Sequence, residues 1–156
     1  MRETEKVDFM TMLPAQRLLA KSAAILLVIG LLTGVFVSAA MTGKIAADPG
    51  AALASHLNAL MGCFWMAAVG WSLPMLGYGE RALGRLAWAT VIPNFANWAV
   101  TVLKAMLKVK GIDAVGEGKN DLVFGLLTLL VVVPSLAAAG AWAWGFRKNG
   151  SARAAS

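Results

Sequence analysis

The sequence predicts an all-α integral membrane protein built as a four-helix bundle. Of its 156 residues, 59% are hydrophobic and only 14% are charged, whereas a soluble domain carries about a quarter charged residues. Four stretches contain no Asp, Glu, Lys, Arg or His: residues 22–43, 57–79, 86–103 and 122–146. They are 18 to 25 residues long, and roughly 20 helical residues cross a hydrocarbon core of about 30 Å.

We expect a single transmembrane domain over residues 1–156, with helices at about 18–42, 56–78, 84–108 and 121–146. The remaining tails and three loops are too short for a soluble catalytic domain. Any chemistry must therefore use residues inside the bundle or at its two rims. The chain has one cysteine, Cys63, and one histidine, which excludes an intrachain disulfide and a zinc site with three or four protein ligands.

The basic residues indicate the orientation in the membrane. Nine lie in the two tails and the second loop: Arg2, Lys6, Arg17, Lys21, Arg81, Arg85, Arg147, Lys148 and Arg153. Five lie in the first and third loops: Lys44, Lys104, Lys108, Lys110 and Lys119. This excess predicts that both termini are cytoplasmic, in a bacterial inner (plasma) membrane. We read the net charge of +6 as a topology signal and expect no nucleic-acid partner, because the basic residues are not clustered with aromatic ones.

The first and fourth helices are composed mainly of packing residues. The first carries Gly30, Gly34 and Ser38 at spacings of four, which allows another helix to approach closely, either within the bundle or at a subunit interface. The fourth is rich in Leu, Val and Ala. We expect Pro134 to kink it and Trp142 to anchor it at the membrane interface.

The third helix carries a polar face. Thr90, Asn94, Asn97 and Thr101 follow one another at spacings of four, three and four, with Pro93 among them. Amides at membrane depth are costly unless they are hydrogen bonded or hydrated. We interpret this face as the lining of a cavity, with hydrogen bonding between helices as the alternative.

The second helix is predicted to begin at the only histidine, His56. Below it, one face carries Leu60, Cys63, Ala67, Gly70 and Pro74. These mostly small residues predict a shallow trough that accommodates either a neighbouring helix or a flat ring such as a porphyrin. Judged from the residues alone, a lone histidine at a helix end is more often solvated or capping than a haem ligand.

Three short segments resemble the styrene oxide isomerase family of small four-helix membrane enzymes. They are Ala54-Ser55-His56, Leu73-Pro74-Met75-Leu76-Gly77 and Ala96-Asn97. Asn120-Asp121 is also similar, and the resemblance extends over roughly residues 20–146. It implies a homotrimer with haem b held between subunits. It further implies that His56 is the axial ligand of the haem iron and that Asn97 positions the epoxide oxygen.

The chain departs from the family pattern at three positions. The tyrosine of the active site is Thr101 here, an asparagine of the second helix falls at Gly62, and a polar residue falls at Pro93. We therefore expect a reshaped pocket, a different epoxide or a distinct reaction. A hairpin centred on residue 82 or 83 would also put Asn97 level with Ala68, about 18 Å from His56 along the helix axis.

The first hypothesis for function is a haem b-dependent isomerase that opens a small apolar epoxide, dissolved in the lipid bilayer, to a carbonyl compound. Asn97 would be the catalytic residue, with a substrate pocket formed by Asn94, Trp98, Thr101, Phe64 and Trp65. A second hypothesis is a haem-binding electron-transfer or haem-handling membrane subunit, although one histidine per chain is unlike a bis-histidine cytochrome. A third is a haem-free small transporter or assembly module.

Overall fold

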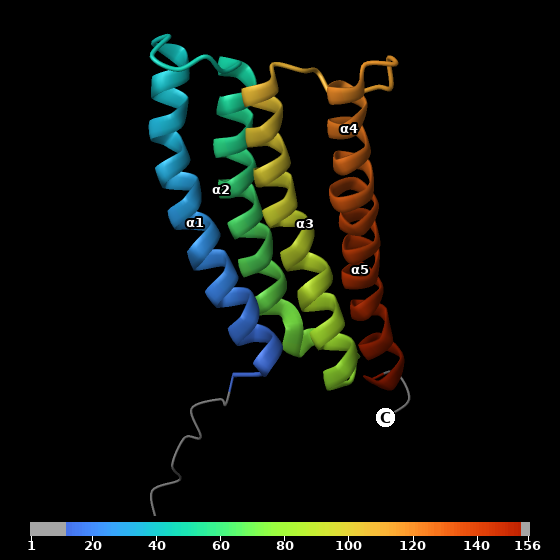
Figure 1. Cartoon of the computed structure of the whole chain (residues 1–156). Coiled ribbons are helices and arrows are strands. Elements are labelled where there is room, and N and C mark those ends of the chain that lie inside the picture. The colour runs from blue at the N-terminus through green and yellow to red at the C-terminus, as the bar shows by residue number, and fades with distance from the viewer. Residues whose placement is uncertain (1–11, 154–156) are drawn as a thin grey trace, which may run out of the picture.

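Four long helices run antiparallel in the computed structural model of the chain (Figure 1). The structure describes residues 12–153 and the side chains of residues 12–147. The first three helices are α1 (Pro14–Met41), α2 (Pro49–Ser72), which ends in the short 3-10 turn η1 (Leu73–Met75), and α3 (Glu80–Leu107). The fourth comprises α4 (Gly118–Leu126), the π-helical segment η2 (Leu127–Val132) and α5 (Val133–Arg153). Within the described residues, all four are long and apolar enough to cross a membrane, so the chain is an integral membrane protein.

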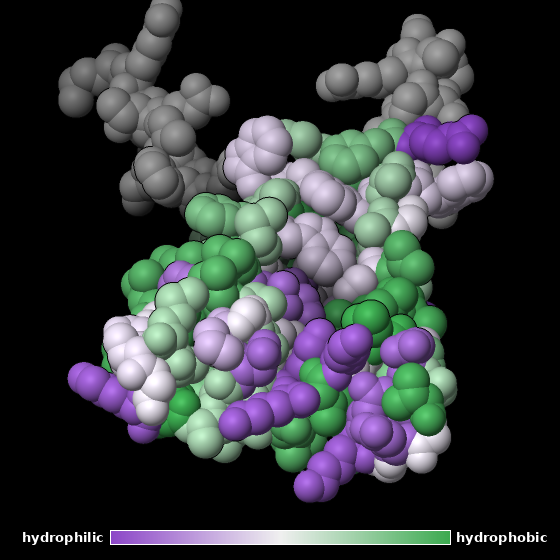
Figure 2. All heavy atoms as spheres, turned by 90° about the horizontal axis from the view of Figure 1, so that it is seen from above, coloured by the Kyte–Doolittle hydropathy of each residue, from purple (hydrophilic) through white to green (hydrophobic). Residues whose placement is uncertain are grey.

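The two ends of the bundle carry the hydrophilic residues. The loops that follow α1 and α3 lie at one end, and hydrophilic side chains gather on the face that they form (Figure 2). The start of α1, the α2–α3 turn and the end of α5 lie at the other end (Figure 1). Arg2, Lys6 and the side chains of Lys148 and Arg153, which contributed to the predicted orientation, lie outside the described residues.

Helix α2 begins seven residues before its predicted start. The Asp48 carboxylate accepts a hydrogen bond of 2.7 Å from the backbone nitrogen of Ala51, and Pro49 occupies the first helical position. Asp as a cap followed by Pro is a strong helix-start signal, and the prediction missed it by following the apolar run alone. His56 consequently lies within α2 and not at its end.

The predicted separation between Asn97 and His56 was wrong. The Asn58 side chain donates a hydrogen bond of 3.1 Å to Asn97, so Asn97 lies level with the region of His56 and not with Ala68. The reason is that α3 starts at Glu80 and includes charged residues in its first turns. The turn between α2 and α3 is therefore centred near Gly77 rather than near residue 82.

Glycine residues allow α1, α2 and α3 to pack closely. A Cβ atom on Gly30 of α1 would lie 3.0 Å from the Cβ of Ala59 on α2. A Cβ on Gly62 of α2 would lie 2.7 Å from Asn94 Oδ1 and 2.9 Å from Leu26 Cδ2. The first-helix glycine therefore serves a contact within the bundle, and Gly62 marks the place where three helices meet.

The last helix is joined to the bundle at its α5 end. The Trp142 indole nitrogen donates a hydrogen bond of 2.8 Å to the Ser72 hydroxyl, so this residue fastens α5 to α2 in addition to any role at the interface. The wider turn η2 lies just before Pro134, whose ring would otherwise crowd the carbonyl of residue 130. The predicted irregularity at this proline thus takes the form of a π-helical segment.

We expect Gly62→Ala to destabilise the protein, because the new methyl group would overlap Asn94 Oδ1. Overpacking of this kind costs about 1–3 kcal/mol, which should appear as a lower midpoint of unfolding in detergent. Gly125→Ala is the matched control, since a Cβ there has no neighbour within 4 Å. Equal midpoints for the two variants would contradict the close approach at Gly62.

Candidate functional site

The hydrogen bond of His56 defines which ring nitrogen can bind a ligand. Its Nδ1 lies 2.7 Å from the backbone carbonyl oxygen of Gly30 on α1. Because a carbonyl oxygen can only accept, Nδ1 must carry the hydrogen. The neutral imidazole then presents a lone pair at Nε2, and within the described residues His56 makes no second hydrogen bond.

Two glycines of α1 form the surface on which the imidazole rests. Gly30 supplies the carbonyl that fixes the ring, and a Cβ atom on Gly34 would lie 3.6 Å from its Cε1 atom. The ring is half-buried. A metal-binding histidine usually donates its second ring nitrogen to a carbonyl or carboxylate, which sets its tautomer and its orientation. The His56–Gly30 pair has this arrangement.

A trough runs between α1 and α2 further along the predicted small-residue face. It has a volume of about 650 Å³ and is lined by Ala67, Gly70 and Pro74 from that face and by Ala20 and Ala23 from α1, among others. His56 and Leu60 do not line it. Cys63 is a free, buried thiol. The predicted trough therefore exists, but only along the half of the face that is more distant from His56.

The polar face of α3 meets α2 through an amide that the sequence analysis missed. The Asn58 Nδ2 atom donates to Asn97 Oδ1 at 3.1 Å and to Thr101 Oγ1 at 3.0 Å. The Thr101 hydroxyl in turn donates to the Asn97 backbone carbonyl at 2.6 Å. The sequence did contain a signal for Asn58. It is an amide within a run that has no charged residues, as Asn94 and Asn97 are in the third helix.

The other half of the polar face is bonded within α3. The Thr90 hydroxyl donates to the Leu86 carbonyl at 2.9 Å, and Asn94 Nδ2 donates to the Thr90 carbonyl at 2.7 Å. Both side chains are buried. The polar groups of this face are thus hydrogen bonded within and between helices, which is the alternative that we considered. None of them lines the apolar groove between α1 and α3.

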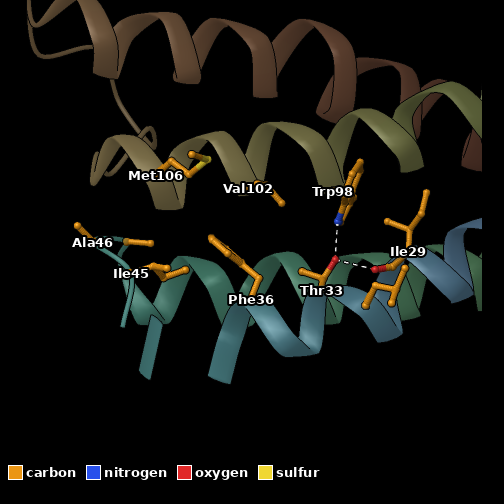
Figure 3. Close-up of a pocket in the computed structure, with 10 residues that line it drawn as sticks. Ile29, Thr33, Phe36, Ile45, Ala46, Trp98, Val102 and Met106 are labelled. Atoms are coloured by element: carbon orange, nitrogen blue, oxygen red, sulfur yellow. Dashed lines mark hydrogen bonds between the residues drawn. The ribbon is translucent and has the colours of Figure 1, made fainter. Parts of the chain in front are cut away.

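An apolar groove of about 700 Å³ separates α1 from α3 near the loop after α1 (Figure 3). Its lining consists of Ile29, Leu32, Thr33, Phe36, Ile45, Ala46, Ala47, Trp98, Val102 and Met106. At one end of the groove the Trp98 indole nitrogen donates to the Thr33 hydroxyl at 3.0 Å, and that hydroxyl donates to the Ile29 carbonyl at 2.7 Å. The groove suits an apolar molecule, because its polar side-chain atoms are already paired.

The structure distributes the predicted pocket residues over several places. Trp98 lines the groove, Thr101 belongs to the contact with Asn58, and Asn94 is buried against Gly62. Phe64 lies on the outside of α2 and is 65% exposed, whereas Trp65 packs against the hydrophobic core. A single chain therefore does not bring these side chains together around one cavity.

The His56 imidazole and the Asn97 amide lie on different sides of α2. His56 bonds to α1, whereas Asn58, only two residues further on, bonds to α3. Two residues on a helix differ in direction by about 200°. Among the described residues, no group of three or more His, Cys, Asp or Glu side chains could hold a metal ion. His56, the single histidine of the sequence, is therefore the imidazole that an iron-containing cofactor could use.

We expect Thr33→Val to lower the stability of the protein, because the Trp98 N–H would lose its acceptor across the groove. A hydrogen bond between membrane helices contributes about 0.5–2 kcal/mol, and the loss can be measured as a shift of the unfolding midpoint in detergent. Thr128→Val is the control, because that hydroxyl bonds only to the Phe124 carbonyl of its own helix. A loss of the same size in both variants would refute the bridging role of Thr33.

Comparison with known proteins places these residues in a family. A sequence model of the styrene oxide isomerase family matches residues 15–147. The match runs from α1 through most of α5 and includes His56, Asn58 and Asn97. No curated protein matches the chain.

Proposed function

The chain belongs to the styrene oxide isomerase family, and on this basis we propose that it is a haem b-dependent membrane isomerase that opens an apolar epoxide to an aldehyde or ketone. The single observation that supports the haem is the hydrogen bond from His56 Nδ1 to the Gly30 carbonyl. This bond leaves Nε2 with a lone pair for iron. When bound, haem b supplies a Lewis acid that polarises an epoxide C–O bond without net change of oxidation state.

The residues of the chain would bind and orient the substrate. Asn97 offers the N–H groups of its amide, because its oxygen already accepts from Asn58. A hydrogen bond from Asn97 to the epoxide oxygen would strengthen as negative charge develops there. One C–O bond breaks, a substituent migrates with its electron pair to the adjacent carbon, and the remaining C–O bond becomes the carbonyl. Atoms and electrons balance within the substrate.

The apolar side chains would hold the hydrocarbon part of the epoxide. Trp98, Phe64 and Trp65 are the aromatic candidates, and an indole face can also stabilise positive charge on the carbon that loses its oxygen. Asn94 and Thr101 complete the proposed set. A location in the bilayer supports this assignment, since an apolar epoxide partitions there and the groove beside Trp98 is lined almost wholly by apolar groups.

We further propose that the active form is a homotrimer with its site between subunits. His56 faces α1, whereas Asn97 lies in the contact between α2 and α3. If both act on one substrate, a His56 of one subunit and an Asn97 of its neighbour can approach it from two sides. The proposed setting is a bacterial inner membrane with cytoplasmic termini, which is supported by the nine basic residues in the two tails and the second loop against five in the first and third loops.

We expect the purified protein to show the Soret absorption band of haem b and to convert apolar epoxides without an electron donor. His56→Ala should lose most of the bound haem, because it removes the Nε2 ligand. Trp144→Phe is a suitable control, since its side chain is exposed and stacks against Arg147 near the end of the chain. A colourless wild-type protein, or a Soret band that His56→Ala leaves unchanged, would refute the proposed ligand.

Co-expression of His56→Ala with Asn97→Leu tests the position of the site between subunits. Each variant alone should be nearly inactive. When trimers assemble at random from equal amounts of the two variants, about a quarter of all subunit boundaries combine an intact His56 with an intact Asn97, so about a quarter of the wild-type isomerase activity should return. No recovery, with mixed oligomers shown by two affinity tags, would contradict a shared site.

A further inference from the structure

We propose that Asn58 is a positioning residue that orients the Asn97 amide toward the substrate. This inference rests on the proposed function, because it assigns a task to a contact beside the proposed catalytic residue. Neither the polar face of α3 nor the resemblance to the family had indicated Asn58. Its role follows from the hydrogen bonds that the structure gives it.

Both hydrogens of the Asn58 amide are committed to α3. One is donated to Asn97 Oδ1 at 3.1 Å and the other to Thr101 Oγ1 at 3.0 Å. An amide nitrogen has two hydrogens, so none remains for a ligand. The Thr101 hydroxyl donates its own hydrogen to the Asn97 carbonyl at 2.6 Å, which turns a lone pair toward Asn58 and holds that amide in place.

The consequence is a fixed direction for the Asn97 amide. Its oxygen is occupied by Asn58, whereas its Nδ2 atom makes no hydrogen bond within the described residues. Among those residues, no fully buried side-chain nitrogen or oxygen lacks a partner. Asn97 Nδ2 is therefore not fully buried, and its two N–H groups are the donors that this contact leaves for a ligand oxygen.

The packing explains why position 58 provides the amide. A side chain at position 62 would require the ends of the Asn94 and Leu26 side chains to move, so the present packing leaves no space for the asparagine that the family resemblance places there. Asn58 lies one helical turn earlier on the same face of α2. Thr101, in the place of the family's tyrosine, supplies the hydroxyl oxygen that accepts the second hydrogen of the Asn58 amide.

Adhesion of α2 to α3 is the alternative explanation of the same hydrogen bonds. The two explanations differ in how the effects of mutations combine. If Asn58 acts through Asn97, replacing Asn58 can reduce turnover only while Asn97 is present. If Asn58 only holds the two helices together, its bond to Thr101 Oγ1 persists in Asn97→Ala, so replacing Asn58 reduces turnover further in that variant.

The test is a double-mutant cycle of Asn58→Ala and Asn97→Ala, measured in the haem-loaded protein. We expect Asn58→Ala to lower kcat by about 10- to 100-fold with little change in KM, because a misdirected donor affects the transition state more than substrate binding. The double variant should turn over no more slowly than Asn97→Ala alone. Ser55→Ala is the matched control, since this buried hydroxyl on α2 bonds only to the Ala52 carbonyl, and its kcat should equal that of the wild type.

Each other result of the cycle would overturn the inference. If the losses in kcat from Asn58→Ala and Asn97→Ala add, and the wild-type protein is active, the positioning role is refuted and the proposed function stands. A wild-type protein that binds haem but turns over no epoxide refutes the proposed function and this role with it. The same double-mutant cycle can also be measured on unfolding midpoints. Coupling between Asn58 and Asn97 is expected there under both explanations, because the midpoint reports their hydrogen bond and not the positioning of the substrate donor. If Asn58→Ala does not fold, Asn58→Leu fills a similar volume without a donor and serves in the same cycle.

Discussion

The close approach of α1, α2 and α3 around Gly62 is the constraint on which the rest of the structure depends. Inside a membrane, burial of apolar groups does little to join helices, so small residues and hydrogen bonds must do so. Gly62 admits the Asn94 oxygen and the Leu26 side chain at distances where no Cβ atom fits. With the three backbones this close, Gly30 can reach His56 on one side of α2, and Asn58 can reach Asn97 on the other.

The sequence alone predicted the number of membrane-spanning helices, but not where α2 and α3 begin. Runs without charge are a good guide to what lies within the hydrocarbon, and all four contained a helix. Helices extend beyond the hydrocarbon, however, and the residue at which each begins depends on capping residues and on charged residues in the first turn. Asp48 with Pro49, and Glu80 at the start of α3, set those beginnings. Because the turn between α2 and α3 lies earlier in the sequence than expected, the partner of Asn97 moved from Ala68 to Asn58, nearly three helical turns.

The candidate site shows a second limit of prediction from sequence. A histidine and a polar stripe are visible in a sequence, whereas the direction of each side chain depends on which neighbouring helix it meets. His56 and Asn58 stand two residues apart and face different helices. Phe64 and Trp65, which are adjacent, differ as strongly, because one is exposed and the other packs against the core. Only the positions of the neighbouring helices decide these directions.

The π-helical segment η2 gives the last transmembrane helix two different phases. A π turn accommodates one residue more than an α turn, which rotates everything that follows by about 100° relative to an uninterrupted helix. Before it, Val123 fits against Gly111 of the preceding loop; after it, Trp142 reaches Ser72 and the Ala141 carbonyl receives the Tyr78 hydroxyl. One helix can thereby match two sets of partners that no single helical repeat would satisfy. Insertions or deletions between Leu127 and Val132 should therefore be tolerated only where they preserve this offset.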